Sequence, residues 1–248
     1  MTHPPLFSPQ QLTALDPQRI PQHIAIIPDG NRRWAKMHEL DTGLGHKQGG
    51  DNLLNIVKAA AEMGVKTLTF YTFSTENWLR PKDEVDCIMA LLESYLVDQC
   101  SAMVHNGIRL ETVGSLEALP QNVQQELANA KNATAQGKKI DLVLAVNYGA
   151  RDDIVRAVKK LAADCSKKNL KAEDISETLL GSYLDTHRWP DPDLLIRTSG
   201  ENRISNFLLW EMSYTELYFT ETLWPDFSPT CLYHAVLNYQ KRIRRLGE

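Results

Sequence analysis

The sequence predicts a single α/β domain built on a mostly parallel central β-sheet flanked by helices. Three observations support this fold class: a length of 248 residues, a composition with 43% hydrophobic and 23% charged residues, and short apolar runs that alternate with longer segments of helical period. Glycine, asparagine and proline separate these segments. Several of the short runs are apolar at successive positions, which is typical of parallel strands that are covered on both faces.

The elements follow one another in order after Pro21. The expected strands are His23–Ile27, Lys66–Phe73, Ile108–Val113, Ile140–Asn147, Asp193–Thr198 and Glu216–Thr220. The expected helices are Gly50–Glu62, Asp83–His105, Gln121–Gln136, Arg151–Ala163 and Pro229–Leu246. No repeat or linker divides the chain, so we expect residues 1–21 to form a loose N-terminal arm and residues 22–248 to form one domain.

The expected helix Asp83–His105 carries a long apolar stripe. Its members recur near the i, i+3, i+4, i+7 spacing: Val85, Ile88, Met89, Leu92, Tyr95, Leu96 and Met103. Taken alone, this stripe indicates packing into a hydrophobic core.

Charge and composition exclude several classes of protein. Lys and Arg number 27 against 31 Asp and Glu, which gives a net charge of −4 and argues against general nucleic-acid binding. The basic C-terminal residues Lys241, Arg242, Arg244 and Arg245 are better explained as a solvated helix face. We expect no membrane-spanning helix, because no run of about 18 apolar residues occurs, so any membrane contact would be peripheral.

The four cysteines and the N-terminus agree with a cytoplasmic protein. Cys87, Cys100, Cys165 and Cys231 stand far apart, without a CxxC pair or zinc-ligand spacing, so reduced thiols are expected. The first residues lack the apolar core of a signal peptide.

Polar residues follow the first expected strand directly. The segment from Pro28 to Lys36 contains Asp29, Gly30, Arg32 and Arg33. The carboxyl ends of parallel strands are where ligands bind in such sheets, glycine permits close approach of backbone, and a carboxylate suits Mg²⁺. A tight turn without a ligand remains the alternative for this segment alone.

Two more strand ends repeat this theme. Ser74–Trp78, with Arg80 and Glu84, follows the second strand, and Thr198–Asn206 follows Arg197. Arginines beside a glycine-containing turn favour phosphate or diphosphate binding. A helix cap, a packed tryptophan ring and ordinary ion pairs are the alternatives at these positions. No GxxxxGK[ST], GxGxxG or GxSxG motif occurs, so the sequence does not indicate a site for ATP, NAD or acyl transfer.

Four segments together carry a family resemblance. HIAIIPDGNRRWAK, GLGHKQG, YTFSTENWLRP and DLLIRTSGENRISNFLLWEMSYTELYFTETLWPDF resemble the cis-prenyltransferases, in particular the bacterial undecaprenyl diphosphate synthases. The resemblance runs from about His23 to the C-terminus. It implies sequential condensation of isopentenyl diphosphate onto farnesyl diphosphate, with Mg²⁺ as cofactor, in a homodimer that makes a C55-type lipid carrier precursor for cell-wall synthesis.

The resemblance also implies roles for individual residues. Asp29 matches an essential catalytic and Mg²⁺-binding aspartate, and Glu216 matches a second metal carboxylate that is delivered across the dimer interface. Asn77 matches the residue assigned to proton removal, although an amide is a poor base and is better suited to orienting a diphosphate oxygen or water. The implied substrate-binding residues are Gly30, Asn31, Arg32, Arg33, Trp34, Thr42, His46, Ser74, Thr75, Glu76, Trp78, Arg80, Arg197, Arg203, Ile204 and Ser205.

The apolar stripe takes a second meaning from the resemblance. It implies that Asp83–His105 and Lys66–Phe73 line an apolar product tunnel between sheet and helices, with Met89, Leu92 and Leu96 facing the product. Product length would then be set by tunnel volume.

The sequence departs from the family pattern at several positions. Pro28, Arg32 and Thr42 stand where the family usually has Met, Gly and Arg, and Asn202 replaces the usual His or Gln. We expect Arg32 to compensate for the basic residue that is missing at position 42. The alternatives that the sequence leaves open are a medium- or short-chain cis-prenyl synthase, a non-catalytic partner subunit of the same fold, and a generic sugar-phosphate or nucleotide binder.

Overall fold

The strands form one parallel sheet. The computed structural model describes residues 5–168 and 170–242. Within them, six strands pair in the order β3-β4-β2-β1-β5-β6, and each neighbouring pair is parallel. The strands are β1 (His23–Ile27), β2 (Thr67–Ser74), β3 (Ile108–Val113), β4 (Ile140–Tyr148), β5 (Leu194–Arg197) and β6 (Glu216–Phe219). All six predicted strands are therefore confirmed, each end lying within one residue of the expected position.

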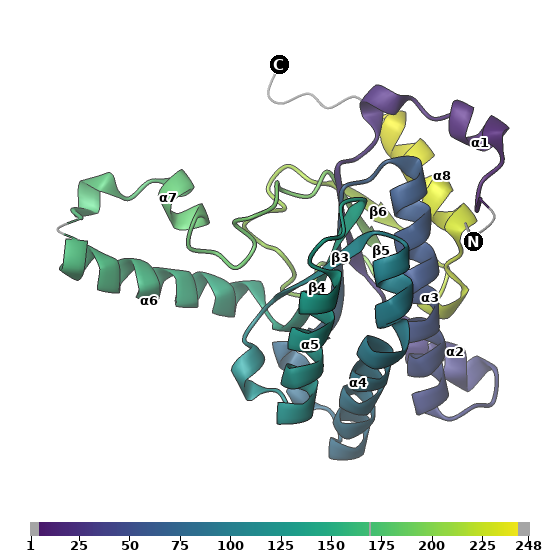
Figure 1. Ribbon diagram of the computed structural model, residues 1–248, viewed down its shortest axis with the longest axis horizontal. Helices are drawn as coiled ribbons and strands as arrows, with labels where there is room; N and C mark the ends of the chain where they lie inside the picture. The colour runs from purple at the N-terminus through teal and green to yellow at the C-terminus, as the bar shows by residue number, and fades with distance from the viewer. Residues whose placement is uncertain (1–4, 169, 243–248) are drawn as a thin grey trace.

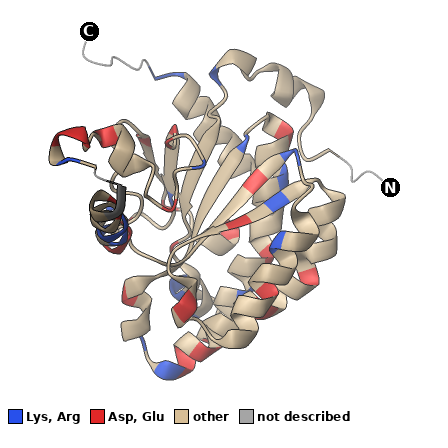
Figure 2. Cartoon of the chain, turned by 60° about the vertical axis from the view of Figure 1, so that its left-hand side comes forward, with Lys and Arg blue, Asp and Glu red and all other residues tan. Residues whose placement is uncertain are grey.

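Burial explains why the central strands are continuous apolar runs. Every residue of β1 and β5 is buried. Because helices or loops cover both faces of a parallel sheet, no position on these strands faces water. Figure 2 shows the consequence: the inner strands are almost free of charged residues, whereas acidic and basic residues are scattered over the helices.

Two hydrophobic clusters lie on opposite faces of the sheet. The larger cluster joins the sheet to α3 (Thr42–Met63), α4 (Lys82–His105), α5 (Gln121–Thr134) and α8 (Pro229–Gln240), which stand together beside the sheet in Figure 1. The smaller cluster contains Ala25, Ile27 and Leu195 from the strands and Phe207 and Leu208 from the segment after β5. The second face is thus covered mainly by a long connection rather than by a helix layer.

The strand order defines where a ligand can bind. From β1 the chain continues into β2 on one side, and β5 lies on the other side. In such sheets the crevice forms outside the carboxyl ends of the strands at this reversal of strand order. The segments that follow β1, β2 and β5 begin at this edge. They carry the three polar clusters of the sequence.

The helices differ from the predicted ones mainly at their starts. α3 begins at Thr42, eight residues before Gly50, because Asp41 caps it with a 2.7 Å hydrogen bond from the Gly43 N–H. The short helices α2 (Asn31–Met37) and α7 (Glu177–Gly181) were not expected from the periodicity. α6 (Ala150–Lys168) starts one residue early and extends further than expected, and residues 243–246 of the last predicted helix lie outside the described residues.

The expectation of a loose N-terminal arm is wrong for residues 5–21. Phe7 and Leu15 are buried in the larger cluster, and α1 (Pro9–Thr13) lies against α8, where the Tyr233 hydroxyl donates to the Gln11 carbonyl at 3.1 Å. Glu62 on α3 accepts the Phe7 N–H at 3.1 Å. Two apolar side chains were enough to fix the arm, although its proline content suggested otherwise.

One described helix is long and apolar enough to cross a membrane, namely α4, which the sequence criterion did not identify. Its buried residues Val85, Met89, Leu92, Leu96 and Met103 face the domain core. α4 also packs against α3, α5 and β3, so in this fold it is a layer of the domain.

α6 projects away from the sheet (Figure 1). Its first turns carry part of a partly buried cluster of charges. The Arg156 guanidinium lies 2.7 Å from Asp152, 3.4 Å from Asp153 and 2.7 Å from Asp185. Burial, followed by the charge of Asp185, raises the pKa of Asp153 to about 7, and burial also raises the pKa of Glu211 nearby. One guanidinium cannot neutralise this many carboxylates, so a proton is retained near neutral pH.

The raised pKa of Asp153 predicts a pH-dependent stability difference. The folded state binds a proton that the unfolded state has lost between pH 4 and 7, so the contribution of this group to stability falls as pH rises through that window. Asp153→Asn keeps a neutral side chain at every pH. We expect this variant to gain a few kcal/mol in unfolding free energy relative to the parent between pH 5 and pH 8, at about 1.4 kcal/mol per pKa unit, measured by urea unfolding.

Asp152→Asn is the matched control, because Asp152 contacts the same guanidinium from a more exposed position. Its stability difference from the parent is expected to stay flat over this pH range. An equally flat difference for Asp153→Asn would show that Asp153 ionises normally.

Candidate active site

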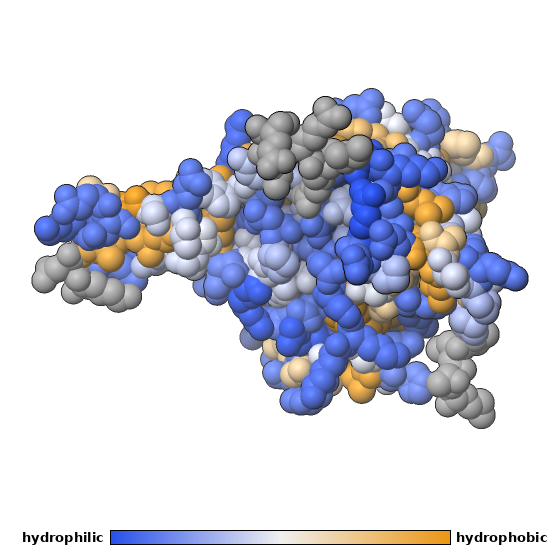
Figure 3. Space-filling view, turned by 90° about the horizontal axis from the view of Figure 1, so that it is seen from above, coloured by the Kyte–Doolittle hydropathy of each residue, from blue (hydrophilic) through white to orange (hydrophobic). Residues whose placement is uncertain are grey.

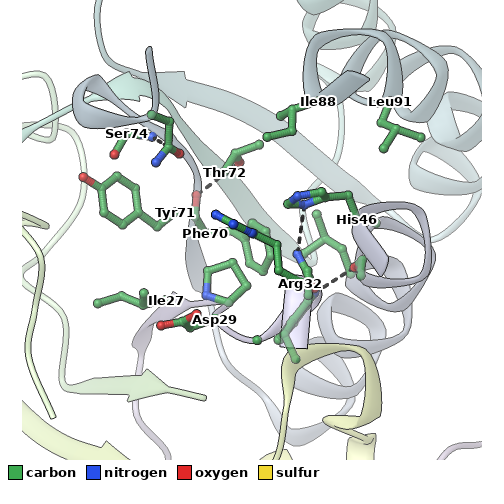
Figure 4. A pocket seen from close by; sticks show the side chains of 18 of the residues that line it. Ile27, Asp29, Arg32, His46, Phe70, Tyr71, Thr72, Ser74, Ile88 and Leu91 are labelled. Carbon is green, nitrogen blue, oxygen red and sulfur yellow. Dashed lines mark hydrogen bonds between the residues drawn. The ribbon is translucent and has the colours of Figure 1, made fainter. Parts of the chain in front are cut away.

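A cavity of about 910 Å³ opens at the carboxyl edge of the sheet (Figure 4). It lies between the ends of β1, β2 and β5 and the helices α2, α3 and α4. Among the described residues that line it, the basic ones are Arg32, Arg33, Lys36, Arg80, Arg197 and Arg203, and Asp29 is the acidic one. Its apolar lining includes Leu53, Phe70, Leu92 and Leu144, and Figure 4 shows Ile88 and Leu91 on the side away from Asp29. The cavity therefore has a cationic end and a hydrocarbon end.

Asp29 and Arg197 form the centre of the cationic end. Asp29 follows β1 and Arg197 ends the neighbouring strand β5, and the Arg197 Nη2 donates to Asp29 Oδ2 at 2.8 Å. The Arg197 side chain is only 4% exposed, whereas that of Asp29 is 31% exposed and lines the cavity. Burial alone would raise the pKa of Asp29, but Arg197, together with Arg33, outweighs burial and holds this pKa below its usual range. Asp29 is therefore an ionised carboxylate beside a buried cation.

The backbone around Asp29 is fixed from two sides. Its N–H donates to the Thr198 hydroxyl at 2.8 Å, that hydroxyl donates to the Asp29 carbonyl at 2.6 Å, and the Trp224 N–H donates to the same carbonyl at 3.0 Å. Gly30 then adopts a φ of 111°, and a Cβ on it would lie 2.9 Å from Leu223. Glycine is thus required to turn the chain from β1 into α2.

A second layer of arginines surrounds this pair. Arg33 donates to the Ser199 carbonyl at 2.9 Å and lies 3.5 Å from both Asp29 and Glu201. Arg203 is ion-paired with Glu201, and the Ser205 hydroxyl accepts from Arg197 at 2.7 Å. Each guanidinium already has an oxygen partner, so these side chains are held in place without a bound anion.

The turn after β2 forms the facing wall. The Asn77 Oδ1 accepts the Ser74 N–H at 3.1 Å, which is drawn as a dashed line in Figure 4. Asn77 also lines the cavity, and its Nδ2 is an amide donor. Asn77 can donate a hydrogen bond there but cannot remove a proton.

Glu84 gathers the basic groups at the cavity mouth. Its carboxylate lies 2.9 Å from Arg80, 3.4 Å from His46 Nε2 and 3.9 Å from Arg32. Burial, together with Arg80, lowers the pKa of His46 in spite of Glu84, so the imidazole is neutral at pH 7. Its Nδ1 lies 3.4 Å from Asn31 Nδ2, and this bond holds Asn31 at the start of α2. Glu84 was noted in the sequence, but its central position was not predicted.

The apolar wall corrects the predicted tunnel residues. Leu92 lines the cavity as expected, but Met89 and Leu96 are buried in the core instead. Ile88, Leu91 and Tyr95 of α4 take the lining positions, and Figure 4 shows Ile88 and Leu91 above the polar end. The error arose because the apolar stripe is wide enough for one side to face the sheet and the other to face the cavity.

The cavity brings together most of the implied site residues. Those that line it are Asp29, Gly30, Asn31, Arg32, Arg33, Thr42, His46, Ser74, Asn77, Arg80, Arg197, Arg203 and Ser205. Pro28 lines it as well. Lys36, Tyr71, Thr72 and Trp224 line it too. Lys36 lies in the first polar cluster, Tyr71 and Thr72 lie in the strand expected to line the tunnel, and Trp224 lies in the last family segment, but none of the four was assigned individually as a site residue.

Six implied residues do not line the cavity. Trp34 donates to Asp226 at 2.8 Å and stacks on His38, and Trp78 donates to Asn147 at 2.8 Å. Trp34 is half-buried, and Trp78 is 38% exposed with an edge contact to Phe73, so neither ring is fully packed into the core. The others are Thr75, Glu76, Ile204 and Glu216.

Glu216 stands apart from Asp29 in this chain. It begins β6, at the edge of the sheet opposite to the cavity, and accepts from Arg242 Nη1 at 2.7 Å. Within one chain it cannot share a ligand with Asp29.

The residues at the cationic end fit a magnesium ion that is held largely by its substrate. No group of three or more His, Cys, Asp or Glu residues suited to a metal occurs in the part of the chain that the structure describes. Mg²⁺ is commonly bound through one or two carboxylates together with phosphate oxygens and waters. Asp29, ionised and facing the cavity, supplies such a carboxylate.

The fold and the cavity define a class of protein. A single-domain parallel α/β protein with a cationic and a hydrocarbon end in one cavity is suited to an amphiphile with an anionic head. Comparisons with known proteins specify this class. The family model described as putative undecaprenyl diphosphate synthase matches residues 27–247. The chain belongs to this prenyltransferase family.

Relatives in other organisms cover almost the whole chain. An isoprenyl transferase of Chlamydia pneumoniae is 49% identical over 93% of this chain and 94% of its own length, and that of Staphylococcus saprophyticus is 46% identical over 94% and 92%. These similarities agree with the cis-prenyltransferase resemblance of the sequence motifs.

Two solved structures share the fold. A lavandulyl diphosphate synthase from Lavandula x intermedia, in complex with dimethylallyl diphosphate, superimposes with a TM-score of 0.90 at 37% identity, covering 93% of this chain and 100% of that one. A probable undecaprenyl diphosphate synthase from Campylobacter jejuni gives a TM-score of 0.77 at 32% identity, covering 92% and 99%. The predicted fold class is thereby confirmed.

Proposed function

We propose that the protein condenses isopentenyl diphosphate repeatedly onto farnesyl diphosphate to make a long-chain Z-polyprenyl diphosphate, of the undecaprenyl type used as a cell-wall lipid carrier. The observation that carries this proposal is the division of one cavity into an arginine-rich end and an apolar end. Prenyl diphosphates have the same division between head and tail. The bound dimethylallyl diphosphate of the lavandulyl diphosphate synthase, a structural neighbour, supports an allylic diphosphate in this cavity.

The chemistry requires stabilisation of a leaving group. The carbon–oxygen bond of the allylic diphosphate breaks, and its electron pair leaves with the diphosphate. The double bond of isopentenyl diphosphate then forms the new carbon–carbon bond, and loss of one proton sets the Z double bond. Arg33, Arg197 and Arg203 supply preorganised positive charge where negative charge accumulates. Mg²⁺, held by Asp29 and the substrate, would neutralise further diphosphate charge.

Asn77 orients a substrate oxygen in this mechanism. Its carbonyl oxygen is occupied by the Ser74 N–H, and its Nδ2 remains as a donor. A donor at this position can hold a diphosphate oxygen, and that oxygen or a water can accept the proton from the condensing unit. The role of general base that the family resemblance implied for Asn77 is therefore replaced by a positioning role.

The apolar end accepts the growing chain. The whole cavity, with a volume of about 910 Å³, lies at the upper end of ordinary ligand sites, roughly 300–1000 Å³. A head group and a short tail fit within such a volume, so the longest products require α3 and α4 to separate or the tail to emerge. The lavandulyl diphosphate synthase shares the fold, so a short-chain product is the alternative that an assay must distinguish.

We also propose that the protein is a cytoplasmic homodimer. It would contact the membrane peripherally when it releases its product. Exposed apolar side chains include Val155 and Val158 on the projecting α6, Ile175 before α7, Leu209 and Tyr214 in the segment after β5, and Leu217 on the edge strand β6. The projecting segment is visibly hydrophobic in Figure 3. A second copy would bury this face, and it would bring a Glu216 to a cavity that has one carboxylate of its own.

Product analysis tests the reaction directly. Purified protein with Mg²⁺, farnesyl diphosphate and labelled isopentenyl diphosphate is expected to give a product near C55 on chromatography, and EDTA is expected to abolish it. Asp29→Ala should lower the rate by on the order of 10²–10³-fold or more, as for loss of a charged stabilising group. Asp29→Asn, which can still accept from Arg197, controls for misfolding. A shorter product would leave the proposed condensation chemistry in place and change the proposed role of the product. Absence of any incorporated label would refute the proposed reaction.

Arg32→Gly tests the compensation for position 42. Arg32 lines the cavity with 63% of its side chain exposed, and it lies in regular α2, so it tolerates a Cβ where the family has glycine. Loss of a charge-assisted contact, worth about 1.5–3 kcal/mol, should raise the KM for farnesyl diphosphate about tenfold or more with little change in kcat. Adding Thr42→Arg should restore the KM. An unchanged KM for Arg32→Gly would exclude compensation.

Sedimentation tests the dimer. The protein is expected to sediment at twice the chain mass of 28.1 kDa. Val155→Lys with Val158→Lys places charges on the α6 face and should shift the protein to monomer, since these side chains are 49% and 48% exposed. Val97→Lys with Val104→Lys on α4 is the matched control, at 55% and 49% exposure. A parent protein that is monomeric and active would contradict the dimer.

A further inference from the structure

Three separate segments meet at Gly149. The turn between β4 and α6, the 3₁₀ turn after β2 and the segment 203–208 approach so closely there that a Cβ on Gly149 would lie 2.5 Å from Thr75 Oγ1 and 2.8 Å from Asn206 Nδ2. No room for a methyl group exists between them. The contact is therefore a specific junction between segments that are far apart in the sequence.

Asn206 is the polar centre of this junction. Its carbonyl accepts the Ala150 N–H at 2.8 Å, its Oδ1 accepts the Arg151 N–H at 3.0 Å, and its Nδ2 donates to Glu76 Oε1 at 2.9 Å. A backbone N–H needs an acceptor and a carboxylate needs a donor, so these partners fix the orientation of the amide. The φ of 60° also suits asparagine better than most residues.

The bond between Asn206 and Glu76 joins the two polar walls of the cavity. Ser205, the residue before Asn206, accepts from Arg197, and Arg203 precedes it by three positions. Glu76 immediately precedes Asn77, whose side chain caps the turn after β2. Neither Asn206 nor Glu76 lines the cavity, so the resemblance-based placement of Glu76 among the substrate-binding residues does not match the geometry.

We propose that Asn206 is a positioning residue for prenyl transfer, which acts by holding the Glu76–Asn77 turn against the Arg197–Ser205 segment. The two walls then present their donors to the bound diphosphates at a fixed separation. This inference rests on the proposed function. It assigns to Asn206 and Glu76 the task of setting the distance between the two walls, with no contact to substrate.

An exchange of charges tests the inference. Asn206→Asp is nearly isosteric, still offers an acceptor to the Arg151 N–H, and places a second carboxylate against Glu76. Loss of a hydrogen bond to a charged group predicts a rise of about 10- to 100-fold in the KM for isopentenyl diphosphate. When Glu76→Gln is added, the amide at position 76 becomes the donor and the carboxylate at position 206 the acceptor. The double variant should therefore return to a KM close to that of the parent. Glu76→Gln alone should have a small effect, because its amide can still accept from Asn206.

Thermal unfolding of every variant separates positioning from folding. If Asn206 had only a structural role, Asn206→Asp would lower the melting temperature, and adding Glu76→Gln would not reverse a rise in KM. Asn132→Asp, the same chemical change on the exposed face of α5, controls for an added charge. Normal kinetics for Asn206→Asp, or a double variant as impaired as the single one, would overturn the inference while the unaltered protein still condenses isopentenyl diphosphate. Absence of product from the unaltered protein would instead refute the proposed function.

Discussion

The ion pair between Arg197 and Asp29 is the interaction on which the site depends. Arg197 is almost completely buried at the end of β5, and a buried guanidinium without a partner would cost several kcal/mol. The partner comes from the neighbouring strand β1, whose Ile27 is paired with Arg197 in the parallel ladder. A slip in this register would separate the two charges. Sheet register and electrostatics therefore require each other at this point.

Other ion pairs between arginine and carboxylate arrange the rest of the cationic end. Glu201 holds Arg33 and Arg203, and Glu84 holds Arg80 and Arg32, so carboxylates position the arginines before any ligand arrives. An entering anion then meets side chains that are already oriented by ion pairs, and the buried Arg197 is the most firmly held of them. It must also compete with these carboxylates. Such a balance favours a ligand of high charge, such as a diphosphate, over one with a single negative charge.

The sequence was sufficient for the sheet and for the location of the site, and it failed where tertiary packing decides. Apart from His23 at the start of β1 and Arg197 at the end of β5, both strands are apolar at every position, so their burial was predictable. The start of α3 was misplaced because Asp41 caps a glycine-rich turn that periodicity cannot detect. Trp34 and Trp78 lie in polar motifs, but their rings contact His38 and Phe73 beside the cavity and do not line it. No local pattern distinguishes a ring that lines a cavity from one that packs beside it.

The segment after β5 shows why a motif can be more informative than a periodicity. Ser199, Gly200, Ser205, Asn206 and Leu208 all have φ between 45° and 76°, a region that costs non-glycine residues of order 1 kcal/mol or more each. These conformations persist because site residues hold them: Arg33 bonds Ser199, Arg197 bonds Ser205, and α6 bonds Asn206. The geometry of the site dictates the sequence of this segment, which follows neither a helical nor a strand repeat. Ser199 and Ser205 are each held by an arginine that also lines the cavity, so groups that the site needs offset part of the backbone strain in this loop.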